Sequence, residues 1–444
     1  MKVGVFILLF CWLKAESKDA TVTIYRDGTA LIKQPVSWSV KKGINSINWD
    51  NLPKNIQQDT PFLSLENASV LSQRFNNKVF TSNDYYQSLK GQKINVKPQD
   101  GKMVSGELLE INPVNLTVKN RSGIFTFNRS NISYLGAINQ ILSPVYEPYL
   151  SWRVQSNISG KLKGQLVYKS KNFSWSTVYR IKMEDEINGE LIAEAVINNN
   201  SNLDFRKTSI QLVEGQLHNF KNNKISPQKN KYVMAPRLAP DPGMTKDDLG
   251  DYHIYQLNDL HDLSAKESVT VRMYGPLNVK YKKTYVFENS ERRQKEEPLE
   301  VKITLKNVES NGLGIPLPDG KIELYTFSSL GGLEYIGADK MGQVPKGQST
   351  DITSGRAFDV IGNRKVLNYD RQRKSEEAVI EIKVTNARNE NINVLLVEHI
   401  NGDWIIKDES LDYQKKDAST IHFPMTLNSG ETKNVYYTYR KEWK

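Results

Sequence analysis

The five histidines are the first residues in this chain whose chemistry would mark a site. They are His218, His253, His261, His399 and His422. A structural zinc ion usually takes four closely spaced ligands, and only His253 and His261 are near enough to share one element. No other ligand accompanies that pair, so we predict no metal site. The sequence also lacks a nucleophile elbow, a phosphate loop and a dinucleotide fingerprint, and therefore predicts no catalytic residue and no cofactor.

Acidic side chains keep one enzymatic alternative open. Glycoside hydrolases need two carboxyl groups about 5 to 9.5 Å apart, a separation that a sequence does not give. A cluster of three acidic residues precedes a predicted turn at Asn188-Gly189, and we interpret their side chains as solvated. These residues are Glu184, Asp185 and Glu186. The other cluster lies in a long predicted loop and lacks the spacing of a calcium loop: Asp241, Asp247, Asp248 and Asp251.

Four aromatic residues allow two interpretations. Exposed rings would form a surface on which sugars stack, whereas rings inside a β-sandwich belong to its core. The two-residue alternation around them favours the core for the whole group: Trp152, Trp175, Tyr179 and Trp404.

The first fifteen residues have the pattern of an export signal. Lys2 precedes an apolar run from Val3 to Leu13, and Ala15 is a small residue suited to cleavage. The run is shorter than the roughly 20 apolar residues that span a bilayer. Lipidation at Cys11, the single cysteine, would tether the chain to a membrane, but the bulky Phe10 disfavours it. We therefore predict a signal peptide over residues 1–15 and an exported protein, periplasmic, on the outer surface or secreted.

Composition is that of a folded, soluble chain. Of 444 residues, 38% are hydrophobic and 25% charged, and the net charge is +10. Positive charge favours anionic partners such as envelope polysaccharide, although solvated lysines are the alternative. Export disfavours nucleic acid as a partner.

Short alternating segments between turn residues predict an all-β protein. We expect an N-terminal small β domain over residues 21–80. Five short strands over 85–140 predict an SH3-like small β-barrel, either a spacer or a binding module, whose inward residues are Ile94, Val96, Leu108, Leu116, Val118, Phe125 and Phe127.

Longer strands follow the predicted barrel. They predict one β-sandwich module over 145–290, interrupted by a long loop at 218–250, and a C-terminal β-sandwich module over 295–444. Asn198, Asp204 and Asn386 fall at predicted strand ends, where short polar side chains satisfy turn backbone.

Nine segments carry a family resemblance. In chain order they are LSWRV (150–154), SWSTVY (174–179), GELIAEAVINNNSNLDF (189–205), IQLVEGQL (210–217), DYHIYQL (251–257), LGIPLPDGKIELY (313–325), YIGADKMGQVPKGQ (335–348), GRAFDVIGNR (355–364) and VTNARNENINVLLVEHINGDW (384–404). Together with the N-terminal TVTIYRDGTALI they resemble the mucoidy inhibitor A-like family, whose C-terminal part is the domain of unknown function forty-one thirty-nine. The predicted barrel stands where many members carry a coiled coil, so the chain is similar to a shorter branch.

The resemblance implies a bacterial envelope or extracellular protein and supplies no catalytic residues. We therefore expect non-enzymatic binding or scaffolding, with an envelope protein or an anionic polysaccharide as partner and no transmembrane span. A polysaccharide-active hydrolase of the envelope is the alternative. Self-association into a homo-oligomer through exposed strand edges also stays open.

Overall fold

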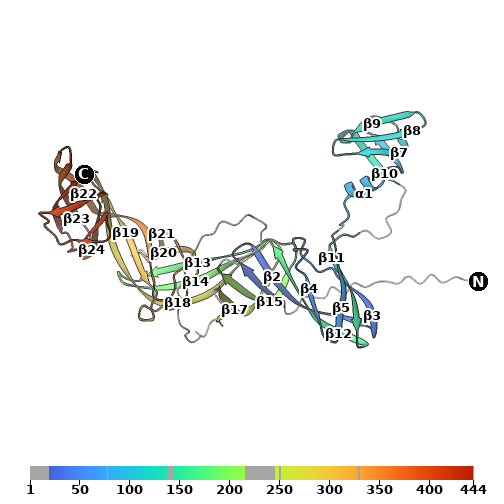
Figure 1. The fold of residues 1–444 in the computed structure, drawn as a ribbon, viewed down its shortest axis with the longest axis horizontal. Helices are drawn as coiled ribbons and strands as arrows, with labels where there is room; N and C mark the ends of the chain where they lie inside the picture. Colours follow the sequence, from blue (N-terminus) through green and yellow to red (C-terminus); the bar gives the residue numbers. More distant parts are fainter. Residues whose placement is uncertain are drawn as a thin grey trace, which may run out of the picture.

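The computed structural model describes residues 20–77, 79–137, 145–215, 246–249, 252–328 and 331–443. Strand accounts for 68% and helix for 3% of the structure, which confirms the predicted all-β class. The predicted signal peptide and most of the predicted loop at 218–250 lie outside the described residues. In Figure 1 strands β22–β24 lie at one end of the molecule and β3 and β5 near the other.

Two sheets combine N-terminal strands with strands from the middle of the chain. The seven-stranded sheet has the order β16 (Lys246–Leu249), β17 (Tyr252–Leu263), β15 (Phe205–Glu214), β1 (Thr21–Tyr25), β2 (Thr29–Val40), β12 (Gly160–Lys171), β4 (Phe62–Leu65). The three-stranded sheet has the order β3 (Gly43–Trp49), β11 (Tyr149–Ser156), β5 (Ala68–Asn76). Because β1 pairs in parallel with β15 and β2 pairs with β12, these sheets extend past the predicted boundary at residue 80.

A small five-stranded sheet is inserted between the paired strands β5 and β11. After α1 (Ser82–Ser88), its order is β10 (Ile132–Ala137), β6 (Lys93–Pro98), β7 (Val104–Ile111), β8 (Asn115–Asn120), β9 (Gly123–Asn128), with the 3₁₀ turn η1 (Arg129–Asn131) before β10. The five predicted strands are present as one open sheet rather than a closed barrel, since β9 and β10 are its edges. Phe125 was predicted to point inward, but it lies on edge strand β9 and is 36% exposed.

The largest sheet carries the C-terminal half of the chain. Its main path is β21 (Leu333–Met341), β20 (Gly320–Phe327), β13 (Phe173–Met183), β14 (Asn188–Asn199), β18 (Glu267–Ser290), β19 (Lys295–Lys306), β22 (Ser349–Arg371), β23 (Ser375–Asn386), β28 (Thr432–Glu442), β25 (Trp404–Lys407). Off this path, β24 (Ile392–His399) pairs with β18 and with β27 (Thr420–Leu427), and β26 (Gln414–Lys415) pairs with β27. The turn η2 (Glu309–Asn311) follows β19.

The long strands β18 and β22 each contribute residues to two hydrophobic cores. The first part of β18 pairs with β14, and its last residues pair with β19 and β24. In the same way β22 pairs with β19 and then with β23. There are two separate hydrophobic cores, but they do not divide at the predicted boundary between residues 290 and 295. The first core, shared with the N-terminal sheets, includes Ile303 to Ile352 of the predicted C-terminal module, and the second is made by β22–β28 with the end of β18 and the start of β19.

Three buried asparagines recur at strand ends. Asn199 ends β14, Asn307 follows β19 and Asn386 ends β23, and all three are fully buried. Each side-chain amide donates to two backbone carbonyls from two different segments and accepts one backbone N–H. These bonds supply the partners that buried backbone groups need, so each asparagine joins two loops at the end of a strand. The predicted turn role of Asn386 agrees with this arrangement.

Candidate functional site

Five of the quoted segments meet around Arg26, which follows β1. Its guanidinium lies 3.6 Å from the ring centroid of Trp175 and donates to the Glu214 carboxylate at 2.6 Å. It also contacts Asp319, through the backbone carbonyl and the carboxylate, both at 2.9 Å. Gln343 donates to the other oxygen of Glu214 at 2.5 Å. The group therefore links the N-terminal sheet to β13 and β20, and we call it the Arg26 clasp.

Glycine is required where the clasp approaches β20. Gly320, the first residue of that strand, lies opposite Thr177 of β13, and a Cβ atom there would fall 2.3 Å from the Thr177 carbonyl oxygen. A side chain at this position would push the two strands apart and move Asp319.

The Arg26 clasp predicts a pH dependence of stability. Burial raises the pKa of Glu214 above its usual 4.5, although Arg26 and Gln343 favour the charged carboxylate. A carboxyl group whose folded-state pKa is raised loses stabilising effect as the pH rises above its unfolded pKa. We therefore expect Glu214→Gln to gain stability relative to wild type as the pH is raised from about 4 to 7, measured by urea unfolding.

Glu309→Gln is the matched control for that measurement. The Lys346 ammonium lowers the pKa of Glu309, so this variant should lose stability relative to wild type over the same pH range. If Glu214→Gln instead follows the trend of Glu309→Gln, the ion pair with Arg26 outweighs the burial of Glu214.

A second ionic group is buried in the C-terminal core. The Arg364 and Glu398 side chains are fully buried and lie 2.8 Å apart, and the Tyr437 hydroxyl donates to the same carboxylate at 2.5 Å. The remaining Arg364 N–H groups donate to the backbone carbonyls of Glu291 and Arg293. Arg364 therefore fixes the turn between β18 and β19.

β22 carries a bulge beside this turn. Glu300 of β19 pairs with Arg356, but Pro298 pairs with Ile361, so four residues of β22, 357–360, face one residue of β19. Bulges of this kind redirect side chains and are common beside functional sites. Phe358 lies in the bulge and is 87% exposed, more than any other large hydrophobic residue among those described.

A polar cavity of about 220 Å³ lies next to the bulge. Besides Val286 it is lined by six charged residues: Glu288, Arg293, Lys295, Glu297, Glu300 and Arg356. Lys295 and Arg356 contact the Glu297 carboxylate at 2.5 and 3.0 Å and lower its pKa. His399 contacts Glu288 at 2.6 Å. Within the described part of the chain, the Arg293 guanidinium has no ion pair and no hydrogen-bond acceptor. We call Phe358 and this cavity the bulge site.

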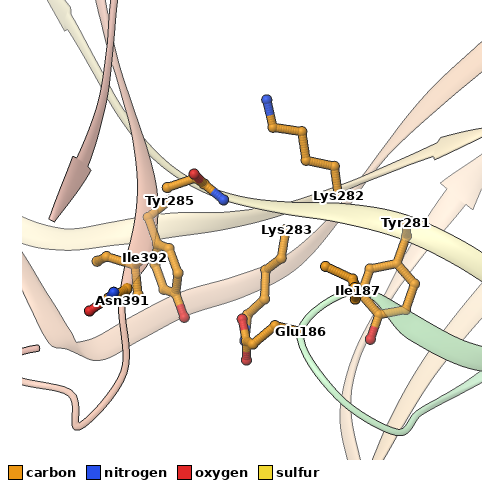
Figure 2. A pocket seen from close by; sticks show the side chains of 9 residues that line it. Glu186, Ile187, Tyr281, Lys282, Lys283, Tyr285, Asn391 and Ile392 are labelled. Atoms are coloured by element: carbon orange, nitrogen blue, oxygen red, sulfur yellow. The ribbon is translucent and has the colours of Figure 1, made fainter. Parts of the chain in front are cut away.

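Another cavity, of about 230 Å³, lies where the two sandwich modules meet (Figure 2). It is lined by the turn after β13, by β18 and by the start of β24. The Lys283 ammonium lies 2.8 Å from Glu186, and the Tyr281 hydroxyl donates to the Asp185 carbonyl at 2.5 Å. Figure 2 shows Lys282 pointing away from these groups. The polar groups of this cavity contact each other and thereby join the two modules. At the bulge site, by contrast, the Arg293 guanidinium has no partner among the described residues.

The predicted candidates for chemistry do not gather at one place. His253 and His261 lie eight residues apart on β17, which separates their backbones by about 26 Å. No group of three or more metal-ligating side chains occurs among the described residues. Asp185 accepts the backbone N–H groups of Ile187 and Asn188, as a turn residue does. His218, Asp241 and Asp251 lie outside the described residues, and Asp247 and Asp248 fall on β16.

The four aromatic residues do not form a stacking surface. Trp152, Trp175, Tyr179 and Trp404 are between 0 and 7% exposed. The Tyr179 hydroxyl donates to the Pro318 carbonyl, and the Trp404 indole donates to that of Ala418. They belong to the cores, as the alternation indicated.

The aromatic residue at the bulge site was not identified from the sequence. Phe358 sits in the quoted segment GRAFDVIGNR, where Ala357 and Val360 are buried three residues apart. That spacing interrupts the strand alternation and is the signal that would have revealed the bulge.

The chain matches no protein-family model and no curated protein. None of the helices in the described ranges has the length and apolar character needed to cross a membrane.

Proposed function

We propose that this protein is an exported, non-enzymatic protein of the bacterial envelope or extracellular space, and that it binds glycan at the bulge site. The observation that carries the proposal is an 87% exposed phenylalanine, Phe358, two residues along β22 from Arg356, which is one of the six charged residues that line the cavity. The resemblance to the mucoidy inhibitor A-like family and the signal-like N-terminus support the location.

The side chains at the bulge site suit a sugar. The apolar face of a sugar ring packs against an aromatic ring, and its hydroxyl groups bond to planar carboxylate and guanidinium groups, which offer paired acceptors and donors. Phe358 supplies the ring, and Glu297, Glu300 and Arg356 supply planar charged groups. The net charge of +10 would draw an anionic polymer to the protein.

Phe358→Ala should weaken glycan binding about tenfold to thirtyfold, because truncating a central aromatic contact typically costs about 1.4 to 2 kcal/mol. Titration calorimetry of the purified protein with envelope polysaccharide fragments would measure the change. Phe327→Ala is the control, since Phe327 is also exposed, at 63%, but lies on β20 away from the cavity. Equal binding by both variants and wild type would contradict the proposal.

The same samples test the hydrolase alternative. Glu214 and Asp319 are both within 2.9 Å of the Arg26 guanidinium, which places two carboxylates near each other. Release of reducing ends from the glycan, abolished by Glu214→Gln or Asp319→Asn, would replace binding with catalysis as the function.

A further inference from the structure

We infer that the bulge site takes an acidic sugar residue, with Arg293 as the residue that binds its carboxylate. This inference rests on the proposed glycan binding and names the class of sugar. Arg293 is the starting point because its guanidinium is exposed and lacks an acceptor in the described ranges, while the cations beside it share Glu297.

The turn that carries Arg293 is held in place by buried side chains. Arg364 donates to the carbonyl of Arg293 at 2.6 Å and to that of Glu291. Lys441 contacts the Glu291 carboxylate at 2.5 Å, and Glu291 in turn accepts the backbone N–H of Asn401. The backbone of Arg293 is thus fixed by buried groups although its side chain is exposed. Less conformational entropy is therefore lost when Arg293 binds a ligand.

The chemistry of the Arg293 guanidinium favours a carboxylate as its ligand. A guanidinium binds a carboxylate through two parallel hydrogen bonds, a geometry that a neutral hydroxyl does not reproduce. The other carboxylates at the cavity already have partners: Glu288 contacts His399, and Glu300 accepts the Thr353 hydroxyl. A cavity of about 220 Å³ accommodates a single small ring or substituent, and Phe358, two residues from Arg356, would cover its apolar face.

The test compares polygalacturonate fragments with the same fragments after methyl esterification, which keeps the sugar and removes the charge. At about 0.15 M salt, where long-range attraction is screened, wild type should bind the acidic form at least tenfold more tightly. Arg293→Gln should bind both forms equally. Arg292→Gln removes the same charge from the next residue, which contacts Tyr369 instead of the cavity, and should keep the preference.

Each outcome of this test has a separate meaning. If wild type binds both forms equally and Phe358→Ala weakens both, glycan binding stands and the role of Arg293 is wrong. A preference retained by Arg293→Gln would also overturn that role. Binding of neither form by wild type would overturn the role of Arg293 for this uronate, and glycan binding itself would fall if envelope polysaccharide fragments also fail to bind.

Discussion

Arg364→Met is expected to lower the free energy of unfolding by about 3 to 5 kcal/mol, the usual cost of removing one partner from a buried ion pair. The substitution leaves the Glu398 carboxylate without its cationic partner in a position that is fully buried. It also removes the donors to the carbonyls of Glu291 and Arg293. Urea unfolding of wild type and variant would measure the loss.

Two further variants make the Arg364 result specific. Arg440→Met removes a cation from an exposed pair with Glu442 on β28, where a loss of at most about 1 kcal/mol is expected. Arg364→Met combined with Glu398→Leu should recover part of the loss, because no unpaired charge stays in the core. A single variant as stable as wild type would show that the turn and the core do not depend on the pair.

Asn386→Leu is expected to cost about 3 kcal/mol or more. The side chain satisfies the carbonyls of Glu390 and Asn428 and the N–H of Arg388, and each buried group left without a partner costs about 1 to 3 kcal/mol. Urea unfolding would give the total, and hydrogen exchange at the Arg388 amide would show the local loss of protection.

The neighbouring Asn391→Leu serves as the control for Asn386. Asn391 is exposed and accepts a single backbone N–H, from Ser429, so its replacement should cost less than about 1 kcal/mol. Asn199→Leu and Asn307→Leu should behave like Asn386→Leu, since both are buried and make the same three bonds. A small effect at all three positions would mean that water replaces the amide.

Alternation predicted the strands but not their neighbours. Along β14 every second residue is buried, as a two-residue period requires, and this local signal gave the all-β class. The parallel pairing of β1 with β15 joins Val22 to Ile210. Periodicity tells which face of a strand is buried and says nothing about which distant strand lies beside it, so the N-terminal unit was predicted as if it closed by itself.

Predicting the bulge site also requires knowing which strands pair and in which register. The exposure of Phe358 follows from the register between β19 and β22, which the residues of β22 alone do not specify. The position of Arg293 beside Arg356 depends on the β18–β19 turn being held by Arg364. By contrast, the burial of Trp152 and Tyr179 was predictable, because their strands alternate regularly.

The unbroken passage of β18 and β22 through both hydrophobic cores has a mechanical consequence. A flexible linker lets two domains swing independently, but here bending at the junction would require two strands to shear along their hydrogen-bonded neighbours at once. A load applied at the C-terminal end is therefore transmitted through the backbone ladder to β14 and its neighbours. Bending at the junction is therefore opposed by the backbone hydrogen bonds that β18 and β22 make on both sides of it.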